Sequence, residues 1–569
     1  MSSRFVRRAR LLSGFFVLAA ALIVVRLYFI QIVHGADYER SAMGQYVEPN
    51  PDTIDRGNIF LTRKGGEPVA AAIMQSGWRI AISPKDVLNA ESTYEMLRSH
   101  VDLDKNKFLE SAAKKDDPYE EVAFRISDEA ASAIRAKKIP GVMLVQDQWR
   151  YYPGGSLAAQ TIGFVGFDGD TKNGRYGLER KWEDTLSKVT SGLYVNPFAE
   201  MFTNAKSALS TKPQLQKGDV ITSIEPSVEH RLEDTLDEVM KTYSPKLSGG
   251  IVMNPHTGEI YAMALRPAFD LNTYYVASPE VFSNQLVEGI YEMGSIMKPL
   301  TMAAGVDTGA VTATTTYNDT GCIEKSGKTI CNFDGKARGV VSMQEVLNQS
   351  LNTGASHIAD RLGHNILGEY VHAYGLGERT GIDLPNEAAG RIGAIDRGYD
   401  VDYASAAFGQ GVAFSPIEMT RALSALANDG VLPNPHVVTG VRLESGITRA
   451  ISPGEGRRVI KPISARSVTN MLVTVFDKAL LKGELKQEHY SIAAKTGTAQ
   501  IANPSGGGYY KDRYLHSFFG YFPAHDPKFI VFLFAVEPHG AEFASATLAR
   551  PFLEIAQFLI NYYNIAPDR

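Results

Sequence analysis

A serine lies three residues before a lysine in the apolar segment YEMGSIMKPL, residues 291–300. On a helix, positions i and i+3 share one face, so Ser295 and Lys298 are expected to project in the same direction. A serine hydroxyl is a weak nucleophile until a base removes its proton, and a neutral lysine amine can act as that base. By itself the pair is a weak signal, because Ser-x-x-Lys arises by chance in a chain of 569 residues.

Two further motifs follow this pair in the chain. Ser350-Leu351-Asn352 comes 55 residues after Ser295, and Lys495-Thr496-Gly497-Thr498 comes 145 residues after Ser350. In this order, the three motifs resemble the Ser-x-x-Lys, Ser-x-Asn and Lys-Thr-Gly set of penicillin-binding proteins and serine β-lactamases. The order and context of the motifs therefore indicate an acyl-transfer site with Ser295 as nucleophile and Lys298 as base.

The chemistry of such a site requires a lysine that is neutral. Burial or a second cation lowers the pKa of an amine, and Lys495 is expected to supply that second positive charge. Ser350 is expected to relay a proton to the leaving amine, and Asn352 to donate to a substrate amide carbonyl.

The Lys-Thr-Gly-Thr segment is expected to form a strand that pairs with an extended substrate along Thr496, Gly497 and Thr498. The two threonine hydroxyls would hold the terminal carboxylate of that substrate. The backbone N–H groups of Ser295 and Thr498 would form the oxyanion hole, the first of them at a helix N-terminus.

The predicted elements around these motifs give an α+β layout. A helix is expected over 226–243, a hairpin over 248–264, a helix from near Ser295, and a helical segment over 341–363 with Ser350 in its middle. Three strands follow at 490–500, 516–524 and 528–538, and a helix over 545–563 closes the chain. One antiparallel sheet should therefore collect strands from both ends of the domain.

The composition excludes several classes of protein. The chain is 44% hydrophobic and 21% charged, which is typical of a folded globular protein. Its net charge of −5 provides no basic field, so no nucleic-acid partner is expected. Two cysteines cannot form a disulfide framework. No metal or cofactor is implied.

The N-terminus is expected to be a membrane anchor. Residues 1–10 carry four arginines and are predicted to be cytoplasmic, and the apolar residues 11–33 are long enough to cross a bilayer once. The body that follows would then lie outside the cytoplasm, on the periplasmic side of the cell membrane. The alternative is a cleaved signal peptide, but the sequence VHGA has His34 where cleavage favours a small residue.

Over nearly its whole length the chain resembles class B penicillin-binding proteins, the monofunctional peptidoglycan D,D-transpeptidases. YEMGSIMKP is similar to their Tyr-x-Pro-Gly-Ser-x-x-Lys-Pro, with Met293 in place of the usual proline, and AFGQGVAFSPIEM at 407–419 is similar to a segment that supports their active-site cleft. DRGNI, RYYP and GRYGLE resemble the three motifs of the family's N-terminal pedestal, where Arg56, Arg150 and Glu179 have structural roles. The resemblance implies a mixed α/β pedestal, similar to the penicillin-binding protein dimerisation domain, over 37–215. A transpeptidase domain over 220–569 would have helices on both faces of its antiparallel sheet, and a linker is expected over 207–219.

The resemblance also implies a reaction and its partners. Ser295 would attack the penultimate D-Ala carbonyl of a D-Ala-D-Ala stem peptide, and an amine of a neighbouring strand would take the acyl group. β-Lactams would inhibit this reaction in cell-wall synthesis. The implied partners are a membrane glycan polymerase of the SEDS type and the proteins of the division or elongation machinery.

Other functions remain open on the sequence alone. A D,D-carboxypeptidase uses the same residues and transfers the acyl group to water. A β-lactamase has no use for the pedestal. The segment QEVLN at 344–348 is similar to the Glu-x-Leu-Asn element of such enzymes, but it precedes Ser350, whereas that element would follow it. A non-catalytic membrane-tethered scaffold would be expected to lose some of the motif residues, and all of them are present.

The two cysteines flank the segment CIEKSGKTIC, residues 322–331. The segment is expected to form a hairpin that turns at Gly327 on the surface near the cleft. Facing positions on antiparallel strands are close enough for a disulfide between Cys322 and Cys331. The alternative is a pair of free thiols.

Overall fold

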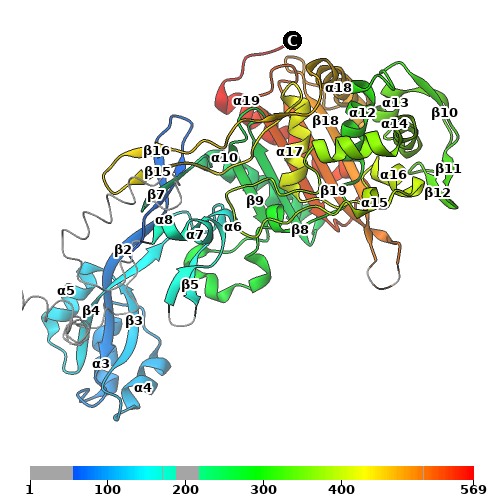
Figure 1. The fold of residues 1–569 in the computed structure, drawn as a ribbon. Coiled ribbons are helices and arrows are strands. Elements are labelled where there is room, and N and C mark those ends of the chain that lie inside the picture. Colours follow the sequence, from blue (N-terminus) through cyan, green and yellow to red (C-terminus); the bar gives the residue numbers. More distant parts are fainter. Residues whose placement is uncertain (1–54, 169–170, 188–216, 504, 506) are drawn as a thin grey trace, which may run out of the picture. The chain divides into compact units, whose positions relative to one another are not determined.

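The computed structural model describes residues 55–168, 171–187, 217–503, 505 and 507–569 (Figure 1). The predicted anchor at 11–33 and most of the predicted linker at 207–219 lie outside these residues, and β7 (Gly218–Thr222) begins at the end of that linker. None of the helices in the described ranges combines the length and the apolar character that crossing a bilayer requires.

The first described part of the chain is a sheet with three helices beside it. Its strands are β1 (Ile59–Thr62), β2 (Pro68–Ile82), β3 (Glu120–Ile126) and β4 (Val142–Tyr151), and the long β2 pairs antiparallel with the other three. The helices are α3 (Ala90–Arg98), α4 (Lys105–Ala113) and α5 (Asp128–Lys137). Each begins at a side chain that caps its first turn: Asn89, Asp104 and Ser127. Their buried faces share one apolar core with the sheet.

Distant segments complete this sheet. β7 pairs parallel with β1, β15 (Val438–Leu443) pairs antiparallel with β7, and β16 (Thr448–Ala450) forms the edge (Figure 1). The strand pairing therefore crosses the predicted domain boundary near residue 220, and that boundary stays a prediction. The shorter elements of this part are α6 (Ala159–Ile162), β5 (Val165–Asp168), β6 (Thr171–Gly174), α7 (Gly177–Lys181) and α8 (Glu183–Leu186).

A second sheet of five antiparallel strands follows the order β18-β19-β20-β8-β9. Its strands are β8 (Leu247–Met253), β9 (Ile260–Arg266), β18 (Ala493–Ala502), β19 (Tyr509–Phe522) and β20 (Phe529–Val536). The prediction of one antiparallel sheet with strands from both ends of the domain is confirmed. β18, which carries the Lys-Thr-Gly-Thr segment, is an edge strand.

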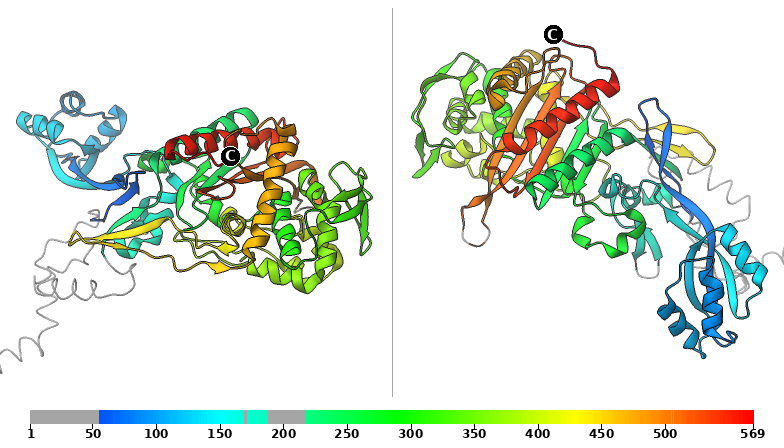
Figure 2. Two further views of the ribbon diagram at one scale, coloured as in Figure 1. Left: turned by 90° about the horizontal axis from the view of Figure 1, so that it is seen from above. Right: turned by 180° about the vertical axis from the view of Figure 1, so that it is seen from behind.

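Helices cover both faces of this sheet, because the alternation of its strands divides the apolar side chains between two cores. Phe518 and Leu533 pack in the core that contains α10 (Pro226–Tyr243) and α19 (Ala544–Tyr563). Their neighbours Phe519 and Phe532 pack in a second core, against the helices on the other face of this sheet. Figure 2 shows α10 and α19 lying across one face. The predicted helices at 226–243 and 545–563 are both present.

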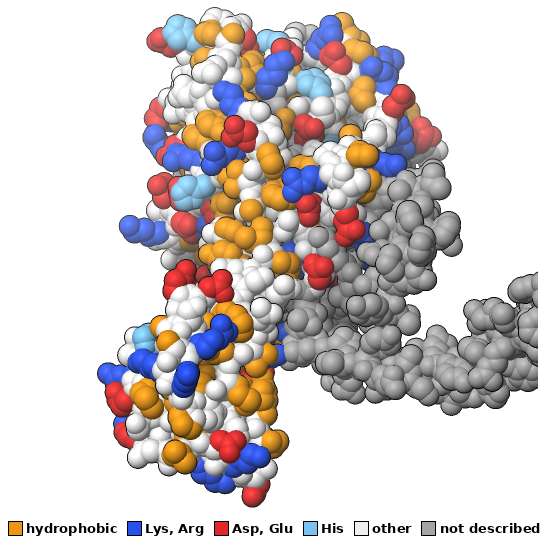
Figure 3. All heavy atoms as spheres, turned by 90° about the vertical axis from the view of Figure 1, so that its left-hand side faces the viewer, with side chains coloured by type: hydrophobic (Ala, Val, Ile, Leu, Met, Phe, Trp, Pro, Cys, Tyr) orange, Lys and Arg blue, Asp and Glu red, His pale blue; other side chains and the backbone are white. Residues whose placement is uncertain are grey.

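The other face of the sheet carries further helices, with small strand pairs around them. The helices are α11 (Gln285–Glu288), α12 (Lys298–Asp307), α13 (Met343–Asn348), α14 (Asn352–Ala373), α15 (Gly393–Arg397), α16 (Asp400–Ala406), α17 (Pro416–Ala427) and α18 (Pro462–Thr474). The small strand pairs are β10 (Thr316–Asp319) with β13 (Gly339–Ser342), β11 (Cys322–Lys325) with β12 (Lys328–Cys331), and β14 (Val431–Leu432) with β17 (Arg457–Arg458). On the face drawn in Figure 3, basic and acidic side chains are interspersed among apolar ones.

Candidate active site

Ser295 lies in the 3₁₀ turn Gly294–Met297, which leads directly into α12. Side chains three residues apart eclipse in a 3₁₀ turn, so Ser295 and Lys298 project from the same side. Gly294 has a φ of +62°, and a Cβ there would lie 3.1 Å from the Cβ of Ala499. The glycine therefore lets the turn that carries the serine approach β18 closely.

Lys298 is buried, with 1% of its surface exposed. Its Nζ donates to the Ser350 carbonyl oxygen at 2.5 Å, to the Ser350 Oγ at 3.2 Å and to the Asn352 Oδ1 at 2.8 Å. The structure therefore places the first two sequence motifs in direct contact.

Ser350 lies between α13 and α14 rather than inside a helix, so the prediction of one continuous helical segment over 341–363 is wrong. Its φ of +56° ends the first helix, and α14 begins two residues later at Asn352. A left-handed conformation costs a non-glycine residue about 1 kcal/mol. Hydrogen bonds from two lysines to this serine offset that cost, and periodicity in the sequence cannot reveal them.

Lys495 joins the third motif to the other two. Its Nζ donates to the Ser350 Oγ at 3.0 Å and to the Thr496 carbonyl oxygen at 3.1 Å. The Ser350 hydroxyl thus lies between two lysine amines that approach it from α12 and from β18. A proton can pass along such a chain of hydrogen bonds without a large movement of any group.

Burial changes the acidity of both lysines. It lowers the pKa of Lys495 to about 7. Burial, and then the positive charge of Lys495, hold the pKa of Lys298 well below its ordinary value. The three acceptors around Lys298 oppose this shift, but burial dominates. The site therefore favours the neutral amine that a general base requires.

Thr496 and Thr498 face a cleft of about 730 Å³ that Ser295, Ser350 and Asn352 also line. The Thr498 hydroxyl accepts a hydrogen bond from the backbone N–H of Ala544 at 3.1 Å. Gly497 permits the close approach of β18 to the serine turn, because a Cβ there would lie 2.3 Å from the Ser517 Oγ and 2.5 Å from the Met293 carbonyl oxygen. All eight predicted site residues thus lie in or beside one cleft.

Asn352 has a different set of partners from the one expected. Its amide oxygen accepts from Lys298, and its amide nitrogen donates to the Cys331 carbonyl oxygen at 2.9 Å. One of its two N–H groups therefore orients the amide toward the lysine. Donation to a substrate carbonyl stays a prediction that rests on the other N–H.

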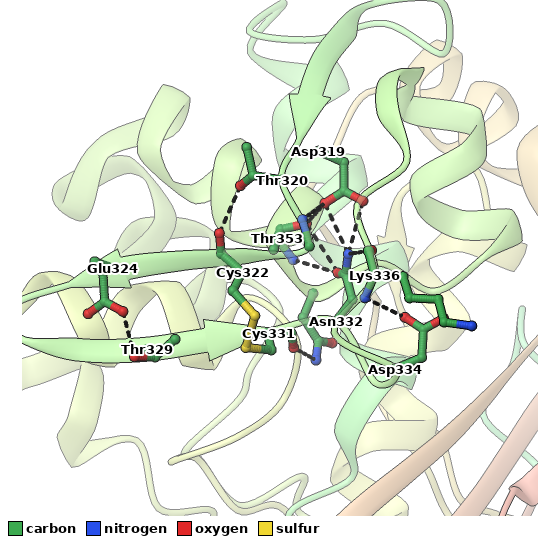
Figure 4. The surroundings of a disulfide bond; sticks show 12 residues. Asp319, Thr320, Cys322, Glu324, Thr329, Cys331, Asn332, Asp334, Lys336 and Thr353 are labelled. Atoms are coloured by element: carbon green, nitrogen blue, oxygen red, sulfur yellow. Dashed lines mark hydrogen bonds between the residues drawn. A yellow bond between two sulfur atoms is a disulfide. The ribbon is translucent and has the colours of Figure 1, made fainter.

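The predicted cysteine hairpin forms one wall of this cleft. β11 pairs with β12 in the register Cys322↔Cys331, the turn lies at Ser326 and Gly327, and a disulfide joins the two cysteines (Figure 4). The predicted pairing and its place near the cleft are confirmed. The next residue, Asn332, donates to both carboxylate oxygens of Asp319, which ties the base of the hairpin to β10.

The three pedestal motifs meet in one buried ion network. The Glu179 carboxylate accepts from the Arg56 Nε at 2.9 Å and from the Arg150 Nε at 2.7 Å, and its side chain is 0% exposed. Arg150 also donates to the Gly57 carbonyl oxygen at 2.7 Å. These contacts join segments 93 and 123 residues apart, which agrees with the structural role expected for them.

Sequence reasoning missed two contributors to the site. The Phe408 ring lies 6.0 Å from the Lys298 ammonium, and the Glu292 carboxylate contacts the far rim of the cleft. Phe408 belongs to the segment at 407–419 that was expected to support the cleft, but nothing in its spacing pairs it with Lys298. Over the described parts of the chain, no cluster of three or more His, Cys, Asp or Glu side chains has a geometry suited to a metal ion.

Comparison with known proteins agrees with this geometry. The chain matches the family described as "Penicillin binding protein transpeptidase domain" over residues 249–555 and the "Penicillin-binding Protein dimerisation domain" over residues 53–195. It is 29% identical to stage V sporulation protein D of Bacillus subtilis, covering 94% of this chain and 82% of that protein. It is also 29% identical to a probable peptidoglycan D,D-transpeptidase FtsI of Caulobacter vibrioides, covering 86% of this chain and 76% of that one.

Solved structures show the same fold. The apo form of penicillin-binding protein 3 from Mycobacterium tuberculosis has a TM-score of 0.65 and 25% identity, over 74% of this chain and 92% of that one. The same protein in complex with aztreonam matches equally well. With both family domains present in order and the three motifs assembled at one cleft, the chain belongs to the class B penicillin-binding proteins.

Proposed function

We propose that this protein is a peptidoglycan D,D-transpeptidase that cross-links stem peptides through an acyl-enzyme on Ser295. The observation that carries the proposal is the hydrogen-bonded chain from Lys298 through Ser350 to Lys495, beside the turn that carries Ser295. Relatives that bear the name of peptidoglycan D,D-transpeptidase support the same reaction.

The first step forms the acyl-enzyme. A neutral Lys298 has two hydrogens and one lone pair, so it gives up one of its three hydrogen bonds and turns the lone pair toward the Ser295 hydroxyl. As the amine takes the proton, the serine oxygen attacks the carbonyl carbon of the penultimate D-Ala. The backbone N–H groups of Ser295 and Thr498 stabilise the oxyanion that develops.

The tetrahedral intermediate then loses the terminal D-Ala. Its C–N bond breaks, and the departing nitrogen takes a proton from the Ser350 hydroxyl, which recovers one from the neighbouring lysines. In the second half-reaction an acceptor amine attacks the ester carbon and loses a proton to Lys298. The C–O bond to Ser295 breaks, and the serine oxygen takes back a proton from Lys298, which leaves the lysine neutral again.

The edge strand β18 accounts for the orientation of the peptide. Its free edge can pair with an extended chain, as edge strands do when they bind peptides. Thr496 and Thr498 would then hold the terminal carboxylate beside the positive charge of Lys495. A β-lactam would occupy the same place, and a related protein has been solved with aztreonam.

Covalent labelling tests the nucleophile. A penicillin should add one adduct mass to the protein, peptide mapping should place the adduct on Ser295, and Ser295→Ala should carry none. Ser356→Ala is the matched control, because this serine lies in α14, donates to the Ala404 carbonyl oxygen and is fully buried. An adduct that persists in Ser295→Ala would refute the assignment.

Product analysis separates the transferase from a D,D-carboxypeptidase. With a D-Ala-D-Ala peptide and an added acceptor amine, a transpeptidase should release D-Ala and yield the cross-linked amide. Release of D-Ala with only the hydrolysed peptide would favour the carboxypeptidase, and turnover of penicillin would favour a β-lactamase. A chain that neither binds penicillin nor releases D-Ala would be a scaffold.

The setting of the enzyme belongs to the same proposal. Residues 11–33 would anchor the protein in the cell membrane with its body on the periplasmic side, over a pedestal at 37–215 and a transpeptidase domain at 220–569. A membrane glycan polymerase of the SEDS type, within the division or elongation machinery, would supply the strands to be joined. Exchange of residues 11–33 for an unrelated anchor should abolish co-purification with the polymerase. If the exchanged protein still binds the polymerase, residues 11–33 serve only as a membrane anchor.

A further inference from the structure

A half-buried carboxylate connects the segment before Ser295 to the opposite rim of the cleft. The Glu292 Oε2 accepts a hydrogen bond from the Tyr509 hydroxyl at 2.9 Å and from the Gly411 backbone N–H at 3.2 Å. Tyr509 begins β19, and Gly411 belongs to the loop after α16. One oxygen atom therefore joins three segments that are more than 90 residues apart in the chain.

Both partners of Glu292 belong to the cleft rim. Tyr509 lines the cleft, and so does Gln410, the residue next to Gly411. Tyr509 pairs with Ala502 at the end of the β18–β19 ladder, beyond the Lys-Thr-Gly-Thr segment. The rim that an extended peptide would meet after Thr498 and Gln500 is thus attached through Glu292 to the turn that carries the nucleophile.

The segment around Glu292 is fixed to its surroundings on every side. Tyr291 exchanges backbone hydrogen bonds with Phe414, the Met293 carbonyl oxygen accepts from the Ser517 hydroxyl at 2.9 Å, and the Gly294 N–H donates to Gly409. The carboxylate therefore projects from a base that is held by its own hydrogen bonds, and its effect falls on its two partners at the rim, the Tyr509 side chain and the loop at Gly411.

We propose that Glu292 is a positioning residue that holds Tyr509 and the Gln410 loop in the conformation that binds the acyl-donor peptide before acylation. The inference rests on the proposed function. In the described structure the carboxylate contacts the rim and not the reacting hydroxyl, so its contribution belongs to binding. Hydrogen bonds to a charged group are among the stronger ones in proteins, and the loss of one corresponds to about a tenfold change in affinity.

The dependence of the acylation rate on penicillin concentration separates the two steps. It yields the dissociation constant of the complex that precedes the covalent bond and the first-order rate of acylation within it. Glu292→Ala should raise the dissociation constant about tenfold and leave the first-order rate within about twofold. Glu292→Gln should retain most of the affinity, because its amide oxygen can accept both hydrogen bonds.

A pair of tyrosines provides the matched comparison. Tyr509→Phe should weaken binding several-fold, and in the Glu292→Ala background it should have little further effect, because the two residues act through one contact. Tyr510→Phe is the control: Tyr510 follows Tyr509 on β19, but it is not among the residues that line the cleft, and the Arg513 guanidinium lies 4.2 Å from the centre of its ring.

The outcomes distinguish this inference from the proposed function. If the wild-type protein forms no covalent penicillin adduct, the proposed function fails. If the wild type is labelled but Glu292→Ala and Tyr509→Phe leave the dissociation constant unchanged, the positioning role is wrong. A loss confined to the first-order rate would also overturn it and would assign Glu292 to the chemical step. Should Glu292→Ala fail to fold, Tyr509→Phe still decides the question, because it removes the same hydrogen bond from the other side.

Discussion

Replacement of Lys495 by methionine should stabilise the fold while it destroys the reaction. Lys495 is 3% exposed and has no carboxylate among its hydrogen-bond partners in the described structure, which are the Ser350 Oγ and the Thr496 carbonyl oxygen. Methionine has a similar length and carries no charge. Lys495→Met therefore removes a buried cation without opening a large cavity.

The size of the effect follows from the pKa of the buried amine. Burial lowers this pKa from 10.5 to about 7. At 1.36 kcal/mol per pKa unit, the charged form of Lys495 destabilises the folded state by about 5 kcal/mol below pH 7. Loss of two hydrogen bonds of about 1 kcal/mol each opposes the gain. The free energy of unfolding should therefore rise by about 3 kcal/mol at pH 6.5.

The pH dependence gives the sharper test. Below about pH 7 the lysine is charged in both the folded and the unfolded state, so the buried charge destabilises the folded state to its full extent. Between about 7 and 10.5 the unfolded chain holds a proton that the folded protein has lost, so the stability of the wild type rises with pH. The difference in the free energy of unfolding between Lys495→Met and the wild type should accordingly shrink as the pH rises from 6.5 toward 10.

Denaturant unfolding of the full-length protein at several pH values measures this difference. Lys241→Met, at an exposed position of α10, is the control and should show neither the gain nor its decline with pH. Acylation by penicillin should fall in Lys495→Met, because Lys298 loses the neighbouring charge that helps to keep it neutral. A variant that is less stable than the wild type at pH 6.5, or whose advantage does not change with pH, would refute the account of two buried lysines.

Three further predictions concern other parts of the molecule. Lys298→Ala should slow acylation by about 10²- to 10⁴-fold, as loss of a general base does, and near-normal acylation would move that role to another group. Glu179→Ala should lower the free energy of unfolding by about 3–5 kcal/mol, because it removes the carboxylate that the buried Arg150 contacts and one of the two that Arg56 contacts; a change below about 1 kcal/mol in denaturant unfolding would contradict this. Cys322→Ser should lower the free energy of unfolding by about 2–3 kcal/mol, since the disulfide closes only a short loop. Intact mass with and without reductant before alkylation checks that Cys331 is paired in the wild type.

Several features of this protein follow from local sequence. The apolar runs of β8, β9, β19 and β20 and the apolar faces of α10 and α19 are strong enough to predict these elements, because the sheet is buried on both faces and each of the two helices packs one side against it. The cysteine hairpin is also predictable, because a short turn at Gly327 sets the register that brings Cys322 opposite Cys331. The three motifs identify the chemistry by residue type and order.

The tertiary structure alone decided how those motifs meet. Ser350 leaves the helical conformation because Lys298 and Lys495 bond to it from distant elements. The acidity of both lysines depends on burial, which the packing of the whole domain creates. β15 joins the pedestal sheet across more than 200 residues of chain, and Glu292 reaches Tyr509 across 217. Local sequence determines which elements form, but contacts between residues so far apart depend on how those elements pack, and these contacts set the geometry of the site.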